Sequence, residues 1–294
     1  MAAVVRHRPC RSGISAVKIF LLVFLVTAFA VQFVIGVLWI FRIRDEARIG
    51  KLWAALRPAG GPGEPFAPGM LDGLPEPARR YLAHAIAPGT PLARAVELRM
   101  TGAVSTDGRK WLPLAAEEIV APGRGFIWRA NARLGGPLRL RAIDHYADGA
   151  ARMLLAFQGL ITMTSKTGPD LARSAAGRLL SESIWLPSAL LPERGAAWEG
   201  IDADHARVRL AVGDVTAVLT LTIDAEGRPV SVVLPRWKDA PGGRWEEAPF
   251  GVFVEEETAF EGYAIPTRLR AGWWPGTEKY LEFARFSVEG ATFL

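Results

Sequence analysis

The sequence is poor in cysteine and asparagine: Cys10 and Asn131 are the only residues of their kinds among 294. The chain after residue 10 therefore has no thiol, which fits an oxidising and a reducing compartment equally well. No lipobox-like cysteine follows the apolar segment described below. Arginine heavily outnumbers lysine and alanine is abundant, a bias typical of a GC-rich bacterial genome.

Familiar catalytic motifs are also absent. The chain contains no G-x-S-x-G, H-E-x-x-H, P-loop or G-x-G-x-x-G sequence. Ser15 and Lys18 match the spacing of a serine–lysine pair, but they lie at the start of an apolar segment, and we interpret the match as chance. We therefore predict no catalytic residue, no metal site and no cofactor.

Histidine is scarce, and the three histidines after residue 71 are not arranged as a metal site requires. Asp144 precedes His145 in a predicted strand, where adjacent side chains point to opposite faces of a sheet. Asp202 lies near His205, but beside a predicted turn. We interpret these two histidines, and His84, as ordinary surface or partly buried residues.

One long apolar segment dominates the N-terminal part of the chain. Residues 19–41, IFLLVFLVTAFAVQFVIGVLWIF, carry no charge. As a helix they would span about 34 Å, enough to cross a bilayer with some tilt. Ala28-Phe29-Ala30 has the form of a signal peptidase site, but a signal peptide's apolar core is only about 7–15 residues long. We therefore expect a retained single-pass anchor, with the lipid bilayer as partner.

The charges that flank this segment do not decide its orientation. Four basic residues precede it and four follow it closely, so the positive-inside rule gives a tie. Long domains are translocated largely regardless of charge, whereas a short basic tail tends to stay inside. We expect an inner (cytoplasmic) membrane protein whose large domain lies outside the cytoplasm.

The net charge of +5 does not indicate a nucleic-acid-binding protein. Residues 1–57 hold nine of the 35 basic residues and two of the 30 acidic residues. The remainder, with 26 basic and 28 acidic residues, is slightly acidic. The basic residues thus flank the apolar segment, where anionic lipid headgroups are the natural partner, and no nucleic acid is implied.

The composition divides the chain into four segments. Residues 1–18 form a basic tail and residues 19–41 the membrane helix. Residues 42–70 combine a polar helical stalk, through Leu56, with a linker rich in proline and glycine. Residues 71–294 form one folded domain, long enough to bury a substantial core.

Within residues 71–294 the hydrophobic periodicity predicts an α+β fold. Asp72 is a candidate N-cap for a helix that ends at Ile86, and Asp170 for a second helix over residues 171–192. Alternating runs predict about eleven strands, with a clear hairpin turn at residues 224–227. We predict a large, curved, half-barrel-like antiparallel sheet that encloses the second helix. After a first strand from Ala95, the strand candidates are residues 111–120, 125–133, 138–146, 151–164, 205–212, 215–224, 227–234, 251–260, 263–273 and 279–288.

Four sequence segments together carry a family resemblance: LPEPARRYLAHAI (74–86), WLPLAAEEIVAPGRGFIW (111–128), RLLSESIWLPSALLP (178–192) and GYAIPTRLRAGWW (262–274). The set resembles an uncharacterised family of bacterial membrane-anchored proteins that is known only as a domain of unknown function. The order of strands and helix also resembles the lipoprotein-carrier (LolA-like) superfamily. That resemblance implies a curved sheet that wraps around helices and can enclose a lipid or another apolar ligand, although a fold does not dictate a function.

Five residues are candidates for a ligand site. If the second helix lies against the concave face of the sheet, Glu182 and Trp185 would border the mouth of a cavity. Trp111, Trp128 and Trp273 occur in predicted strands, where large aromatic side chains can line a ligand cleft. Each tryptophan could equally fill the core between sheet and helix.

Two carboxylate clusters, Glu117–Glu118 and Glu255–Glu257, offer acid–base chemistry, although such residues more often form solvated or salt-bridged edges. On a regular strand the first and third glutamates of the second cluster would share one face. The acidic strand is also expected to face Arg268 and Arg270 across the turn at Gly262.

Three functions remain open. The leading one is non-enzymatic binding or relay of a lipid or other apolar molecule at the membrane surface. It predicts an apolar cavity of several hundred Å³ between the second helix and the sheet. A hydrolase using Glu182 or the acidic strand 255–257 would need titratable groups that converge in one pocket. A protein-interaction module would use an exposed sheet edge or the Trp273-Trp274 turn.

Overall fold

The computed structural model describes residues 16–294 except residue 62. The basic tail expected over residues 1–18 therefore lies almost entirely outside the described residues. The chain divides into two compact units at Glu46 and Ala47. The first unit contains most of α1 (Ala16–Leu56), and the second contains the last ten residues of α1 and all later elements.

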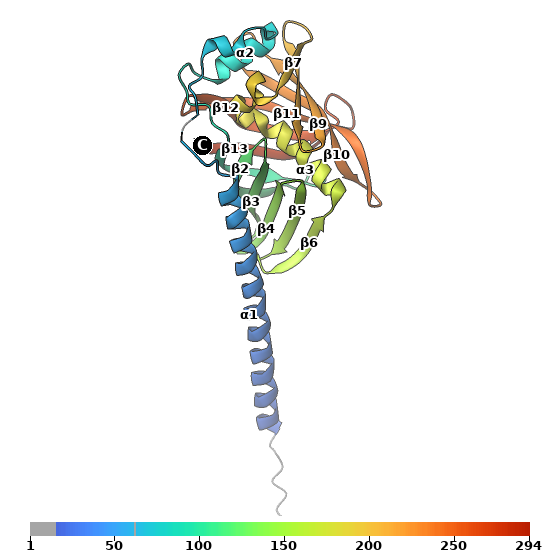
Figure 1. Cartoon of the computed structure of the whole chain (residues 1–294). Coiled ribbons are helices and arrows are strands. Elements are labelled where there is room, and N and C mark those ends of the chain that lie inside the picture. The colour runs from blue at the N-terminus through green and yellow to red at the C-terminus, as the bar shows by residue number, and fades with distance from the viewer. Residues whose placement is uncertain (1–15, 62) are drawn as a thin grey trace, which may run out of the picture. The chain divides into compact units, whose positions relative to one another are not determined.

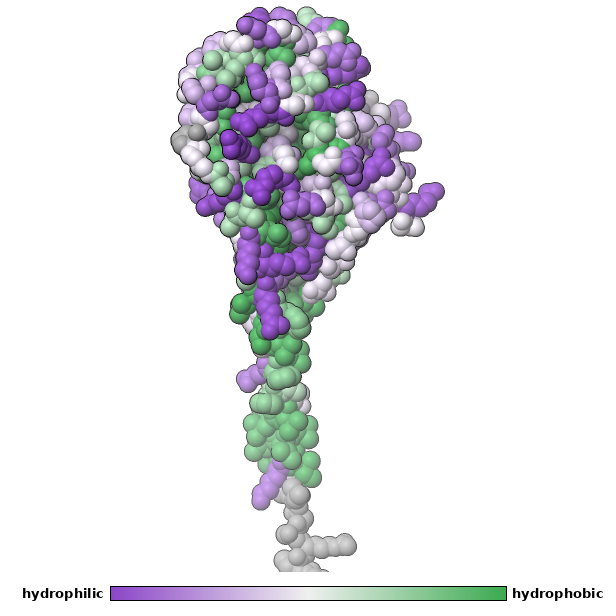
Figure 2. Space-filling view, in the orientation of Figure 1, coloured by the Kyte–Doolittle hydropathy of each residue, from purple (hydrophilic) through white to green (hydrophobic). Residues whose placement is uncertain are grey.

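Among the described residues, α1 is the one helix that is long and apolar enough to cross a membrane, judged by its length and composition. Its apolar side chains from Val17 to Ile43 are exposed around the whole helix, and they form the green column in Figure 2. A soluble helix normally buries one apolar stripe, whereas this part of α1 is apolar on every side. Such a surface is suited to an apolar surrounding.

Thirteen antiparallel strands form one open sheet in the order β6-β5-β4-β3-β2-β1-β13-β12-β11-β10-β9-β8-β7 (Figure 1). The first and last strands in the chain, β1 and β13, lie side by side in the middle. Two meanders, β1–β6 and β7–β13, therefore meet there. The strands are β1 Val96–Val104, β2 Leu112–Ala121, β3 Gly125–Gly135, β4 Leu138–Ala147, β5 Ala150–Phe157, β6 Ile161–Thr167, β7 Ala197–Gly200, β8 His205–Val212, β9 Val215–Ile223, β10 Pro229–Ala240, β11 Arg244–Phe260, β12 Tyr263–Trp273 and β13 Leu281–Phe293.

The α+β prediction is confirmed, with two strands more than the eleven expected. The run over residues 151–164 is two strands, because Gln158 and Gly159 adopt left-handed conformations and turn the chain between β5 and β6. The other additional strand, β7, is only four residues long and has no repeated alternation to reveal it.

The segment between β6 and β7 must cross from one edge of the sheet to the other. It begins with α3 (Pro169–Ser181) and continues in three short 3₁₀ helices, η2 (Glu182–Trp185), η3 (Pro187–Leu190) and η4 (Pro192–Arg194). The single helix predicted over residues 171–192 was therefore too long, since prolines interrupt its second half. Asp170 is not the N-cap: Gly168 holds that place, and the Asp170 carboxylate accepts a hydrogen bond from the Trp237 indole at 2.9 Å.

The helix predicted from Asp72 is also shorter than expected. Asp72 follows the 3₁₀ helix η1 (Pro68–Leu71), and α2 (Glu76–Ala85) begins only after Pro75. The predicted cap was wrong because the intervening Gly-Leu-Pro segment is extended and turned rather than helical. The apolar face of α2 is nevertheless buried, with Tyr81 and Leu82 almost completely enclosed.

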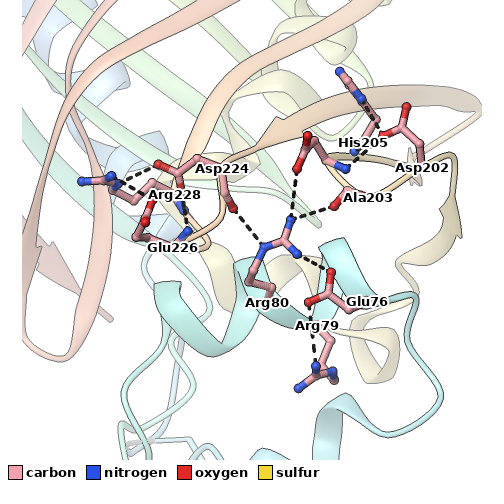
Figure 3. Close-up of polar contacts among 10 residues, drawn as sticks. Glu76, Arg79, Arg80, Asp202, Ala203, His205, Asp224, Glu226 and Arg228 are labelled. Carbon is pink, nitrogen blue, oxygen red and sulfur yellow. Dashed lines mark hydrogen bonds and ion pairs between the residues drawn. The ribbon is translucent and has the colours of Figure 1, made fainter.

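Arg80 fastens α2 to two turns of the sheet (Figure 3). Its guanidinium donates to the carbonyl oxygen of Asp224, in the turn between β9 and β10, at 2.9 Å. It also donates to the carbonyl oxygen of Ala203, before β8, at 2.8 Å, and pairs with Glu76 one turn earlier on α2. The Asp224 side chain accepts a hydrogen bond from the Arg228 amide at 2.8 Å and thereby closes the predicted hairpin turn.

The end of α1 packs against the sheet on the face opposite to α3. Ile49 and Leu56 are buried there. Trp53 donates to the Glu97 carboxylate on β1 at 2.6 Å, and its ring lies under the Arg129 guanidinium. The last turns of α1 are thus part of the second unit. The other members of this outer cluster are Ala95, just before β1, and the sheet residues Ile119, Ala121, Ile127, Ile143 and Leu154.

Candidate functional site

A cavity of about 390 Å³ lies between the concave face of the sheet and the α3–η2 segment. Strands β1 to β5 and β10 to β13 all contribute to its walls. This is the kind of cavity that the leading sequence hypothesis predicts. Its walls are mainly apolar and include Leu112, Leu114, Leu140, Val252, Leu269 and Phe286.

The cavity exists because small side chains occupy inward positions on facing strands. Ala130 and Ala132 on β3, Ala142 on β4 and Ala271 on β12 all line it. Larger side chains at these positions would fill the space between the sheet and the helix, as they do in ordinary close-packed cores. The alternation of strand residues places all four on the same inner face.

Four of the five predicted site residues line this cavity: Glu182, Trp185, Trp128 and Trp273. Trp185 is buried, and its indole N–H donates to the Pro266 carbonyl at 3.0 Å, so it forms a fixed part of the wall. Trp111 is not among the lining residues. It lies just before β2, with the Arg285 guanidinium 4.3 Å from its ring centroid.

A cluster of charged side chains forms one part of the cavity wall. Arg178 on α3 donates to three carboxylates at once: Glu182 at 2.6 Å, Glu118 at 2.7 Å and Asp144 at 2.8 Å. Glu118 comes from β2 and Asp144 from β4, so Arg178 ties the helix to both strands. The Glu118 side chain is only 1% exposed. Charge-assisted hydrogen bonds of this kind are strong enough to hold a buried charge in place.

Burial changes the proton affinity of this cluster. It raises the pKa of Glu118 well above its usual range, and the nearby negative charge of Glu182 adds to the effect. Burial also raises the pKa of Glu182, although Arg178 opposes the change. For Arg178 burial alone would lower the pKa, but the three carboxylates outweigh it and the pKa is raised. Glu118 and Glu182 therefore hold a proton more tightly than exposed carboxyl groups do.

Arg236 on β10 is a second arginine at the cavity, and it is buried. Its guanidinium lies 4.3 Å from the Phe250 ring centroid and 5.5 Å from that of Trp273. Burial, with a contribution from the positive charge of Arg178, lowers its pKa to about 10. Arg236 thus remains charged at neutral pH in an environment with aromatic side chains.

The sequence interpretation missed most of the charged cluster. The sequence favours a solvated edge or a salt-bridged face for Glu117 and Glu118. Glu117 is exposed and paired with Arg129 at 2.7 Å, whereas Glu118 forms its ion pair with Arg178 in the buried cluster. Glu118 shares the inward parity of the apolar residues of β2, which was the available signal. The i, i+4 spacing of Arg178 and Glu182 was a second signal. No sequence pattern predicts that Arg236 is buried, because a charged residue in an otherwise apolar series of inward positions is expected to mark the end of the buried face.

The other predicted clusters lie away from the cavity. Arg268 pairs with Glu255 at 3.2 Å and also contacts Glu256. These ion pairs confirm that the acidic strand faces the arginines of the next strand. The prediction that Glu255 and Glu257 share a face was wrong, because a β-bulge interrupts the register of β11 at this point. Glu257 instead contacts His84 on α2 at 2.6 Å. Within residues 16–61 and 63–294, no group of three or more histidine, cysteine or acidic side chains is arranged to hold a metal ion.

Three solved structures share a limited similarity with this chain. A LolA superfamily protein from Nitrosomonas europaea is 9% identical, with a TM-score of 0.41 over 74% of this chain and 92% of that one. A putative outer membrane lipoprotein-sorting protein domain from Vibrio parahaemolyticus is 10% identical, with a TM-score of 0.39 over 68% and 85%. A DUF1329 family protein from Desulfovibrio piger is 8% identical, with a TM-score of 0.33 over 68% and 86%.

The comparison with curated proteins finds no match. A family model does match, over residues 64–286, and its description is "Family of unknown function (DUF6544)". The match runs from the segment before α2 into β13 and therefore includes the whole cavity. It confirms the family resemblance drawn from the four sequence segments. The chain belongs to the DUF6544 family.

Proposed function

We propose that this protein binds or relays a lipid or other apolar ligand in the cavity between α3–η2 and the sheet, without catalysing a reaction. The observation that supports this best is the cavity itself, whose walls are mainly apolar and whose charged residues are few and clustered. Binding sites for small apolar molecules have this composition and size. A close-packed protein core would leave no such space.

We further propose that residues 19–41 anchor the protein in the bacterial inner membrane and that the sheet domain lies on the extracytoplasmic side. The apolar, uncharged surface of this part of α1 supports the anchor. An anchor raises the local concentration of the cavity near molecules dissolved in the bilayer. The membrane is therefore the expected source of the ligand.

The binding proposal is tested with the full-length protein, purified in detergent and examined by native mass spectrometry and solvent extraction. We expect a co-purifying apolar molecule. Ala142→Trp should displace it by filling the cavity, whereas Ala150→Trp, at an exposed position that starts β5, should retain it. Loss of the ligand in both variants, or in neither, would contradict binding at this site.

The orientation is tested by cysteine accessibility in intact cells and spheroplasts. The chain has one native cysteine, so Cys10→Ser provides a background without thiols. Ala150→Cys in that background places one thiol at an exposed position of the sheet domain. We expect a membrane-impermeant maleimide to label it from outside the cytoplasmic membrane. Labelling only after the membrane is broken would reverse the proposed orientation.

A second function has one observation in its favour. Glu118 and Glu182 lie in the same buried cluster, and burial raises the pKa of both, as a general acid would require. If the protein is a hydrolase, Glu182 is the catalytic candidate, because it lines the cavity and Glu118 does not. It predicts that Glu182→Gln abolishes the hydrolysis of a bound ester or glycoside. Ligand that remains intact in the wild-type protein favours simple binding.

A further inference from the structure

The charges at the cavity indicate which kind of polar group a ligand can place there. The cluster contains three carboxylates, Glu118, Asp144 and Glu182, and two guanidinium groups, Arg178 and Arg236. All but Glu118 line the cavity, and Glu118 pairs with Arg178. With every group ionised the cluster has a net charge of −1, and with one shared proton it is neutral. In neither state is it positive. A buried site of this kind gains nothing from a further negative charge.

The two arginines of the cluster differ in how many of their N–H groups have hydrogen-bond partners. Within the described part of the chain, the Arg236 guanidinium makes one hydrogen bond, from Nη2 to the Ser174 carbonyl at a long 3.4 Å, and no ion pair. The side chain is nevertheless only 8% exposed. Arg178, in contrast, donates to three carboxylates. Arg236 is thus the donor of the cluster with unused capacity.

Acceptors with unused capacity lie in the same cluster. Oδ1 of Asp144 and Oε2 of Glu182 are buried and have no hydrogen-bond partner among the described residues. Both side chains line the cavity together with Arg236. Buried polar groups of this kind normally have partners, and an unpaired group destabilises the site. The site therefore combines an unsatisfied donor with unsatisfied acceptors.

We propose that the ligand is an amphiphile with an uncharged hydroxyl end, which accepts a hydrogen bond from Arg236 and donates one to Asp144 or Glu182, while its apolar chain occupies the rest of the cavity. This inference depends on the proposed binding function. A hydroxyl group is suited to the site because it both donates and accepts. An ester carbonyl accepts only, and would leave the carboxylates unsatisfied.

Charged ends fit less well for two separate reasons. A carboxylate or phosphate would place a fourth anionic group beside three carboxylates. An ammonium group could donate to Asp144 and Glu182, but it offers no acceptor to Arg236, which would stay unsatisfied beside a further cation. Either charge would also have to leave water for a cavity with mainly apolar walls. The neutral alcohol avoids both penalties.

The test uses the full-length protein in lipid nanodiscs with three photoreactive probes of equal chain length: a fatty alcohol, a fatty acid and a fatty amine. At about pH 8.5 the acid is ionised and the amine is protonated. Labelling of peptides that contain residues 178–186 and residue 236 is measured by mass spectrometry and divided by the labelling of α1. We expect the alcohol to exceed each charged probe by about tenfold or more.

Charge variants sharpen this test. Asp144→Asn removes one negative charge, and we expect the labelling by the acid probe to rise about tenfold while that by the alcohol changes less than about twofold. Glu182→Gln should act in the same way and replaces Asp144→Asn if that variant does not fold. Arg236→Met should reduce labelling by the alcohol about tenfold. Arg285→Met, at an exposed position outside the cavity, is the matched control and should have no effect.

The outcomes separate the two proposals. Labelling of the cavity peptides by no probe would overturn both the binding function and the hydroxyl preference. Cavity labelling in which the acid or the amine equals or exceeds the alcohol would overturn only the hydroxyl preference. An acid probe that gains nothing from either Asp144→Asn or Glu182→Gln would do the same.

Discussion

Arg178 Nη2 lies 2.7 Å from Glu118 Oε1, and this ion pair joins α3 to the inner face of β2. The pair has a direct consequence for stability, because Arg178 is the shared partner of three carboxylates. Removing the arginine leaves these carboxylates in a buried environment without their cation. Breaking a buried ion pair on one side is much more costly than replacing both partners.

We expect Arg178→Met to lower the free energy of unfolding by about 3–5 kcal/mol at neutral pH. Equilibrium denaturation followed by tryptophan fluorescence measures this change. Arg173→Met is the control on the same helix, since that side chain is half-exposed and lies 3.8 Å from Glu247. It should cost less than about 1 kcal/mol. Equal effects of the two substitutions would show that the buried cluster does not stabilise the fold.

Glu118 should make the folded state less stable as the pH rises. Its folded pKa is raised well above 4.5, chiefly by burial, so the folded state binds this proton more tightly than the unfolded state. The stability from the protonated form is complete below pH 4.5 and is lost as the pH rises through the folded pKa. Glu118→Gln, a neutral amide of similar shape, should flatten this part of the stability profile. Denaturation midpoints across the acidic and neutral range test this, and identical profiles would refute it.

Glu97 should act in the opposite direction. Burial opposes its ionisation, but hydrogen bonds from Arg57 and Trp53 outweigh burial and lower its pKa below 4.5. The stability that its charged form contributes is therefore present above pH 4.5 and lost as the pH falls through the lowered pKa. Glu97→Gln should cost about 1–3 kcal/mol at neutral pH and little in strong acid.

Hydrogen exchange over residues 47–56 measures the local effect of Glu97→Gln, because Glu97 holds the end of α1 against the sheet. We expect faster exchange in this segment. Glu289→Gln on the neighbouring strand β13 is the control, since Glu289 is exposed and accepts a hydrogen bond from Thr101 rather than from α1. Unchanged exchange in Glu97→Gln would mean that apolar packing alone holds the end of α1.

Gly227 and Gly242 both adopt a positive φ, but a Cβ atom would collide with neighbouring atoms only at Gly227. Its φ is +92°, and a Cβ there would lie 2.6 Å from the Arg80 carbonyl oxygen and 2.7 Å from the His84 Cβ. Gly242 has a φ of +81° with no atom within 4 Å of its Cβ position. Gly227→Ala should therefore destabilise the protein by about 2–4 kcal/mol, and Gly242→Ala by only about 1 kcal/mol. Equal losses in denaturation experiments would mean that α2 moves freely away from the turn.

The fold class was predictable from sequence because the two hydrophobic periods are clear. The alternation around Val96, Leu98 and Met100 predicts a strand with one buried face, and all three side chains are buried. The limits of the helices were less predictable, since Asp72 and Asp170 resemble caps but neither acts as one. Local patterns do not reveal which turn or strand a polar side chain will meet.

The candidate site was predictable in part. Glu182 and Trp185 follow from the expected position of the second helix on the concave face. Trp128 and Trp273 follow from their predicted strands, whereas Trp111 does not line the cavity. Glu118 and Arg236 come from strands in the two different meanders, so their meeting with Arg178 depends on how the sheet curves. The docking of Trp53 on Glu97 likewise joins segments far apart in the chain. No local pattern encodes such encounters.

The central pairing of β1 with β13 determines when the cavity can form. Within β1 to β6 and within β7 to β13, each strand pairs with its neighbours in the chain, and such local pairs form early. The contact between Val96 and Phe293 spans almost the whole domain, and pairings this distant in sequence are slow. Until β13 pairs with β1, the protein has two half-sheets with open inner faces. The cavity is therefore one of the last features that folding completes.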